Sequence, residues 1–476
     1  MTGASHPFST FALTRDPIDL GAHGYVEEEY FLSGEARPFD EDPETGAPVH
    51  AGPAKAYASR VLVRRPVHGG SGTTWLSILN ASQGYDIEDD WRRAWNEFIR
   101  RGDTYVALTA KPINVDALKN YDPQRYAALS FGGPTPGIIA EPGWNPFQVI
   151  ETADESLAWE IIAATGRWLR SGENLPTPRE VMLMGQSQSG AYTNAFLTHF
   201  HRILRREGNA PVFDAYLPGV AGCFARPISQ SAQANADAPV MPLPEIVDID
   251  VPVIAVSTDA DIDLFTAMGG DVRDFRNGDG PLRRHWHVSG VPHSDARSRV
   301  IPTNEVIAKA GRLGRDLGQD VLDGLDIAPV EPVIAAAMDA AVKWVREGVP
   351  AAPSVWFDVD PDDPESPLLD EHGARLGGVR LGLVENAVMS FEPASKGNPV
   401  IGAMSALPKH RVLDRYPDFD AYRASCDEVD AELVSSGYLT ESGVRLLHAV
   451  EDEMWRRVTA EDHAAPITPQ LVGARS

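Results

Sequence analysis

Short apolar or alternating stretches recur along the chain, and helical patterns separate most of them. The stretches at 25–32 and 56–63 alternate apolar and polar residues, as antiparallel strands do. Those at 181–184 and 251–256 are almost continuously apolar, which is typical of strands buried on both faces. Antiparallel strands first, then buried strands between helices, predict a doubly wound, mostly parallel α/β sheet. Further strands are expected at 75–79, 104–109, 212–217 and 284–288.

Apolar residues at helical spacing predict the helices of the chain. Trp159, Ile162 and Leu169 share one face of a helix predicted over 147–169. A helix over 332–345 carries Pro in its first turn, where Pro is tolerated. Other helices are expected at 91–101, directly after Ser187, at 419–433 and at 441–458.

The 476 residues, 43% of them hydrophobic, are ample for a large core. We predict a core over 1–348 with irregular insertions near 112–146 and 221–248. Residues 349–476 open with an acidic, Pro-rich stretch and continue with the two amphipathic C-terminal helices. We expect this C-terminal helical extension to pack on the core, because it looks too ordered for a linker.

The most informative motif lies where the strand at 181–184 ends. The chain there reads V-M-L-M-G-Q-S-Q-S from Val181 to Ser189, and an amphipathic helix follows. A strand, a Gly-x-Ser-x-small turn and a helix are typical of a nucleophile elbow, in which the turn exposes the serine hydroxyl. Ser189 stands where a second glycine is usual, with Gly190 directly behind it. We therefore predict that Ser187 is a nucleophile.

A serine nucleophile needs a base to take its proton and an acid to orient that base. His293 follows the strand at 284–288 on a loop of small residues, which suits the base. Two carboxylates, Asp259 and Asp261, follow the strand at 251–256. Asp261 has the usual offset of a triad acid from its strand, and Asp259 is the alternative.

The oxyanion formed in such chemistry needs two backbone N–H donors. The first is expected from Gln188, the residue after the nucleophile. The second is expected from the loop after the strand at 75–79, near Ser82. The string H-G-G-S-G at 68–72 resembles an oxyanion motif but precedes that strand, so we interpret it as a turn.

Composition and charge exclude several classes of function. A net charge of −26 argues against binding to nucleic acid and to anionic membrane surfaces, since both attract basic proteins. The chain contains no stretch of about 18 apolar residues and its start does not resemble a signal peptide, so we expect a cytoplasmic protein. Two distant cysteines, Cys223 and Cys426, are expected to be reduced thiols.

No cofactor or metal is expected. His285 and His287 alternate along one strand without an evident carboxylate or thiolate partner, so we interpret them as structural. The run at 358–362 resembles the start of a calcium loop but lacks its glycine and its final glutamate.

Several stretches together resemble the bacterial alpha/beta-hydrolase domain proteins, a family mostly without assigned substrates. The resemblance spans nearly the whole chain and implies an alpha/beta-hydrolase fold, Ser187 as nucleophile, His293 as base and an acid within 259–261. Asp259 and His287 each stand where the family carries a glutamate. The first departure leaves the identity of the acid open, and the second bears on the substrate. The matching stretches are EEEYFLSGEA near residue 30, SRVLVRRP at 59–66, LNASQG at 79–84, DPQRYAALS at 122–130, GQSQSG at 185–190, STDAD at 257–261, WHVSGVPHSD at 286–295 and GARLGGVRL at 373–381.

These patterns predict a serine hydrolase that cleaves a small-molecule carboxylic ester or lactone through an acyl-enzyme. Two alternatives stay open. An acyltransferase would use the same residues but exclude water, and a protein of this fold could bind a ligand without catalysis.

Overall fold

The computed structural model describes residues 6–9, 13–222, 224–229, 241–242, 249–268, 280–294, 301–314, 319–363, 366–395 and 400–460. The chain forms two compact units. The first comprises Met1–Val253 and Arg299–Arg315, and the second comprises Ile254–Ser298 and Asp316–Ser476. This division differs from the predicted boundary at residue 348, because residues 254–298 group with the C-terminal part of the chain.

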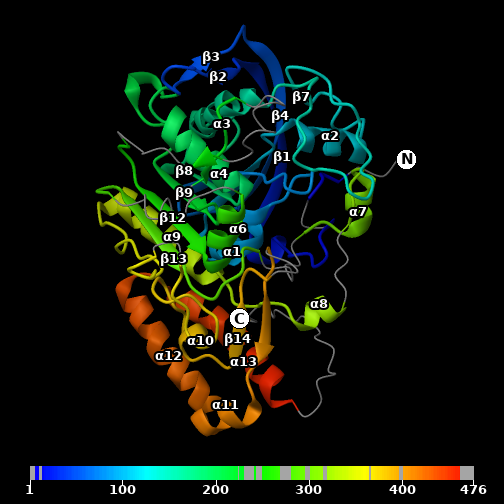
Figure 1. The fold of residues 1–476 in the computed structure, drawn as a ribbon. Helices are drawn as coiled ribbons and strands as arrows, with labels where there is room; N and C mark the ends of the chain where they lie inside the picture. Colours follow the sequence, from blue (N-terminus) through cyan, green and yellow to red (C-terminus); the bar gives the residue numbers. More distant parts are fainter. Residues whose placement is uncertain are drawn as a thin grey trace. The chain divides into compact units, whose positions relative to one another are not determined.

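The sheet of the first unit begins with antiparallel strands, as the alternating pattern predicts. β1 (Tyr25–Ala36) pairs with β4 (Lys55–Pro66) along its whole length (Figure 1). β4 also pairs antiparallel with β6 (Thr104–Leu108) and with the short β7 (Ser130–Phe131). Charged side chains link the first two strands through ion pairs of 2.7–2.8 Å: Arg64 with Glu27, Arg65 with Glu28 and Arg60 with Glu29.

The strands that continue this main sheet are parallel. β5 (Thr73–Ile78) lies between β6 and β8 (Glu180–Gln186), and β9 (Ala215–Gly219) follows β8. Every residue of β5, β8 and β9 is buried, as expected for strands covered on both faces. The predicted order of antiparallel and then parallel strands is therefore confirmed within this unit.

Two helices of the first unit differ from their predicted positions. α3 (Ala158–Ser171) begins about ten residues later than expected, after a 3₁₀ turn at Glu155–Leu157. The side chain of Asp154 accepts a hydrogen bond from Ser156 N and fixes that start. α2 (Pro112–Tyr121) occupies the beginning of the insertion predicted to be irregular, with Pro112 at its first position.

The other elements of the first unit are short, apart from α1. They are α1 (Asp89–Arg101), α4 (Gln188–Ala195) with a π turn at Phe196–Phe200, α7 (Asn304–Lys309), the 3₁₀ turns Gly21–His23 and Glu207–Asn209, and the two-stranded pairs β2 (Phe39–Glu41) with β3 (Pro48–His50) and β10 (Phe224–Ala225) with β11 (Met241–Pro242). Most of the insertion predicted at 221–248 lies outside the described residues.

The second unit contains the late strands and the C-terminal helices. β12 (Val253–Thr258) and β13 (Arg283–Val288) are neighbours, and α6 (Asp259–Ala267) follows β12 directly. β13 makes parallel bridges to Val355 and Val379, and α13 packs on α9. The other elements, all near their predicted positions where one was predicted, are α8 (Gln319–Asp323), α9 (Glu331–Glu347), α10 (Gly382–Glu385), the pair β14 (Met389–Glu392) with β15 (Ala403–Ala406), α11 (Lys409–Arg415), α12 (Phe419–Ser436) and α13 (Glu441–Thr459).

No helix in the described part of the chain has the length and apolar character needed to cross a membrane. Cys426 is a buried free thiol, and Cys223 lies outside the described residues.

Candidate active site

Ser187 occupies a strained turn between β8 and α4. Its backbone angles are φ 55° and ψ −123°, in a region that residues with a side chain rarely adopt. Its N–H donates to the carbonyl of Gly219 at 2.9 Å, which ties the turn to the end of β9. A serine held in this conformation between a parallel strand and a helix has the geometry of a nucleophile elbow.

The glycines around Ser187 are required because backbones nearly touch there. A Cβ on Gly185 would lie 2.4 Å from the carbonyl oxygen of Ser189. A Cβ on Gly190 would lie 2.6 Å from both Gly219 O and the Ala221 side chain. Ser189, at the position where a second glycine is usual, is buried.

In the loop after β5, the N–H that contacts the turn of the nucleophile belongs to a different residue than the one expected from the sequence. The N–H of Ser82, expected to be the second oxyanion donor, donates to Asn80 Oδ1 at 2.7 Å in a local turn. The N–H of Ala81 instead reaches the turn of the nucleophile, where it donates to Gln188 Oε1 at 3.0 Å. Asn80 Nδ2 donates to the carbonyl of Gln186 at 3.2 Å, so this loop is attached on both sides of Ser187.

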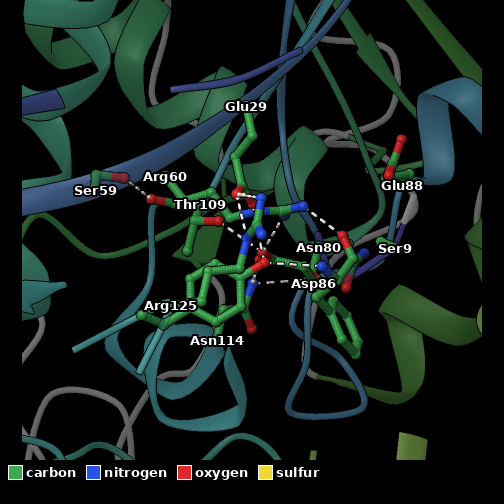
Figure 2. Close-up of polar contacts among 12 residues, drawn as sticks. Ser9, Glu29, Ser59, Arg60, Asn80, Asp86, Glu88, Thr109, Asn114 and Arg125 are labelled. Carbon is green, nitrogen blue, oxygen red and sulfur yellow. Dashed lines mark hydrogen bonds and ion pairs between the residues drawn. The ribbon is translucent and has the colours of Figure 1, made fainter. Parts of the chain in front are cut away.

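A buried polar network also contacts the loop after β5. Asp86 accepts hydrogen bonds from Asn114 Nδ2 at 2.7 Å and from Thr109 Oγ1 at 2.6 Å, and it forms an ion pair with Arg60 at 3.2 Å (Figure 2). Asn114 also donates to the carbonyl of Asn80 at 3.4 Å. Burial raises the pKa of Asp86, while Arg60 and the two neutral donors oppose that shift by favouring its charged form.

In the second unit, His293 and Asp261 form a close pair. His293 Nδ1 lies 2.5 Å from Asp261 Oδ1. Asp261 lies in the first turn of α6, where its Oδ2 accepts from the N–H of Thr258 at 2.7 Å. The rings of Phe265 and His293 lie nearly perpendicular, with centroids 6.1 Å apart. One carboxylate thus caps its own helix and orients the imidazole.

Asp259 has a different set of partners. Its Oδ1 pairs with Arg375 Nε at 2.8 Å, and its Oδ2 accepts from the N–H groups of Arg375 and Gly290 at 3.0 Å each. Burial raises the pKa of Asp259, although Arg375 and both N–H groups favour the charged form. Asp259 therefore braces the loop between β13 and His293.

His285 and His287, interpreted from the sequence as structural, each contact a neighbouring polar group. His285 Nε2 lies 2.7 Å from Ser257 Oγ, and His287 Nδ1 accepts from the N–H of Phe357 at 3.3 Å. No group of three His, Cys, Asp or Glu suited to a metal ion occurs in the described residues.

A partly parallel sheet whose central strand ends in a serine elbow defines the class of alpha/beta hydrolases. The chain belongs to the alpha/beta hydrolase domain family, whose model matches residues 1–448. The resemblance and the fold class predicted from the sequence are thus confirmed.

Several solved structures resemble this chain at low sequence identity, and a search of the curated proteins finds no match to it. Similar structures include an alpha-beta serine hydrolase homologue from Coxiella burnetii (11% identity over 56% of this chain and 88% of that one, TM-score 0.28). They also include the carboxylesterase Cest-2923 from Lactobacillus plantarum (12%, 49% and 72%, TM-score 0.29) and the siderophore hydrolase EstA from Aspergillus nidulans (11%, 55% and 81%, TM-score 0.25). Similarity at this level is too low to assign an activity to this chain.

Proposed function

We propose that this protein is a serine hydrolase that cleaves a carboxylic ester or lactone through an acyl-enzyme. The positive-φ backbone of Ser187, at the end of a central parallel strand, is the observation that carries the proposal. Strain of this kind persists only where the surrounding structure enforces it, and it is common at catalytic residues.

The proposed roles follow from the partners of each group. His293 Nδ1 faces Asp261, and the proposal assigns to the other ring nitrogen, Nε2, the proton of the Ser187 hydroxyl. Ser187 Oγ then attacks the carbonyl carbon, and the imidazolium returns the proton to the leaving alkoxide. Water repeats the sequence on the acyl-enzyme and releases the acid.

The oxyanion is assigned to two backbone donors, the N–H groups of Gln188 and Ala81. Ala81 replaces Ser82 in this proposal because the N–H of Ser82 is already used within its own loop. The oxygen that now accepts from Ala81 is an amide oxygen, Gln188 Oε1, whose chemistry resembles that of a substrate carbonyl.

A fluorophosphonate probe tests the proposal on the intact protein. We expect one adduct by intact mass, mapped to Ser187, and none on Ser187→Ala. Absence of an adduct on the wild-type protein would contradict a serine hydrolase and favour a binding protein of this fold.

A panel of esters and lactones then tests the reaction class. Free acid as the product, unchanged by added alcohols or amines, supports hydrolysis. A new ester or amide formed in preference to the acid would indicate the acyltransferase that uses the same residues.

A further inference from the structure

A lysine that the proposed mechanism does not use lies behind the elbow. Lys111 is fully buried, at 0% exposure, directly before α2. The N–H groups of Asn114 and Val115 both donate to its carbonyl, so the helix fixes its backbone. Buried lysines are rare because desolvation of the ammonium is costly. The contacts of a buried lysine must therefore offset the cost of desolvating its ammonium group.

The contacts of Lys111 Nζ join the two segments that carry the proposed oxyanion donors. Nζ lies 2.9 Å from the carbonyl of Leu79, 3.2 Å from Gln188 Oε1 and 3.1 Å from Ser189 Oγ. Leu79 begins the loop of Ala81, and the other two acceptors belong to the first turn of α4. All three acceptors are neutral oxygens, and one ammonium group has three protons to donate to them.

On this geometry we propose that Lys111 is a positioning residue of the oxyanion site, which fixes the separation between the N–H groups of Ala81 and Gln188. The inference rests on the function proposed above. Lys111 acts through the loop and the helix that it joins. The ring of Tyr192, 4.6 Å from Nζ, supports the cation from the α4 side.

Ser189 suits this arrangement better than the glycine usual at its position. Burial, with a smaller contribution from Arg226, lowers the pKa of Lys111 to about 7, although Glu155, Asp86 and Asp89 oppose the shift. Both protonation states are therefore accessible near neutral pH. A hydroxyl accepts from the ammonium and donates to the amine, so Ser189 keeps its contact with Nζ in either state.

Hydrogen exchange and probe kinetics on Lys111→Met test the inference. We expect peptides covering 79–84 to lose at least about tenfold in protection while the strands of the first unit keep theirs. The rate of fluorophosphonate inactivation should fall about 10- to 100-fold, less than for loss of an oxyanion donor itself. With an ester substrate the fall should appear in kcat, with KM little changed.

Lys119→Met is the matched control, because Lys119 lies on α2, the helix that Lys111 precedes, and has no assigned role; it should behave like the wild type. Lys111→Gln keeps two donors, should give intermediate effects and replaces Lys111→Met if that variant does not fold. Wild-type protection at 79–84 in either variant overturns the inference. Equal loss of protection throughout the unit also overturns it, since Lys111 would then be only structural. The exchange result does not depend on activity. A wild-type protein that fails to react with the probe would therefore count against the proposed function alone.

Discussion

The turn that carries Ser187 requires close approach of backbones at glycines, whereas the groups proposed as its base and acid are positioned by hydrogen bonds of one carboxylate. Around Ser187, glycines let the strand and helix approach to distances that no Cβ would allow. Around His293, one carboxylate of Asp261 fixes both the ring and the start of α6. The turn at Ser187 depends on the absence of a Cβ at Gly185 and Gly190. The pair of His293 and Asp261 depends on single functional groups, so the two should respond differently to substitution.

The largest effect should come from removing the nucleophile. Ser187→Ala is expected to fold normally and to lose roughly three to six orders of magnitude in kcat, because members of a catalytic triad act as a unit. Ser189→Ala is the control, and it should stay within about tenfold of the wild type, since it removes only one of the three acceptors of Lys111. Purified protein, an ester substrate and thermal melts suffice. Reversed results for the two serines would overturn the assignment.

Next in size is the comparison of the two aspartates. Asp261→Asn should cost on the order of 10⁴-fold in kcat with folding intact, because the acid fixes the imidazole tautomer and stabilises the imidazolium. Asp259→Asn should cost at most about tenfold in kcat, since Asp259 pairs with Arg375. It should instead lower the melting temperature by removing a buried charge from that pair. Equal, small losses in kcat for both variants would place the orienting carboxylate elsewhere in the chain.

A third variant probes the backbone of the serine side. Gly190→Ala inserts a methyl group 2.6 Å from Gly219 O, and overpacking of this kind costs about 1–3 kcal/mol. We expect a lower free energy of unfolding and slower labelling by the fluorophosphonate. Gly280→Ala is the control, because its nearest neighbour atom would be 3.9 Å away. A Gly190→Ala variant as stable and reactive as the wild type would refute the view that close backbone approach shapes this turn.

The smallest expected effect lies in the C-terminal helices of the second unit. Burial raises the pKa of Glu451 to about 8, with Asp430 and Asp427 adding to the shift and Arg423 opposing it. As the pH rises, the unfolded chain loses the Glu451 proton near the ordinary glutamate pKa of 4.5. The folded protein keeps this proton to a higher pH. Stability from this group is complete below about pH 4.5 and is lost as the pH rises toward 8.

Glu451→Gln mimics the protonated carboxyl and should remove this pH dependence. Its melting temperature at pH 9 should exceed that of the wild type by a few degrees. Glu453→Gln is the control on the same helix, because Glu453 forms an i,i+4 ion pair with Arg457, a kind of pair that contributes little. Parallel melting curves for Glu451→Gln and the wild type between pH 5 and 9 would contradict the assignment.

The sequence predicts those parts of the site that depend on neighbours in the chain. Ser187 and His293 each follow a recognisable strand, and a local motif marks both positions. Asp261 is favoured over Asp259 by its offset from its strand, and it is the aspartate that contacts the imidazole. The order of antiparallel and parallel strands is predictable for the same reason, since apolar periodicity reports burial along a segment.

Contacts between distant segments are not predictable in this way. Lys111 lies 32 residues from Leu79 and 77 from Gln188, and no local pattern links these positions. Ala81 and Ser82 are adjacent, and only the turn made by the Asn80 side chain determines which N–H points toward the nucleophile. The start of α3 also depends on a side-chain cap at Asp154, which an apolar pattern does not register. The only local feature of the sequence at Lys111 is its place directly before Pro112, the first residue of α2.

The hydrogen bond from the N–H of Ala81 to the side-chain amide oxygen of Gln188 has a consequence for the selectivity of the proposed site. An uncharged substrate carbonyl that displaces it exchanges one neutral acceptor for another, so the exchange changes the free energy of binding little. An oxyanion at the same place accepts a charge-assisted hydrogen bond, which is roughly twice as strong. The ground-state carbonyl replaces a hydrogen bond that the glutamine already makes, so it gains little affinity from this donor. The oxyanion of the transition state gains the difference between a charge-assisted and a neutral hydrogen bond. Neutral carbonyl ligands should consequently bind weakly there, and tetrahedral, negatively charged ones tightly.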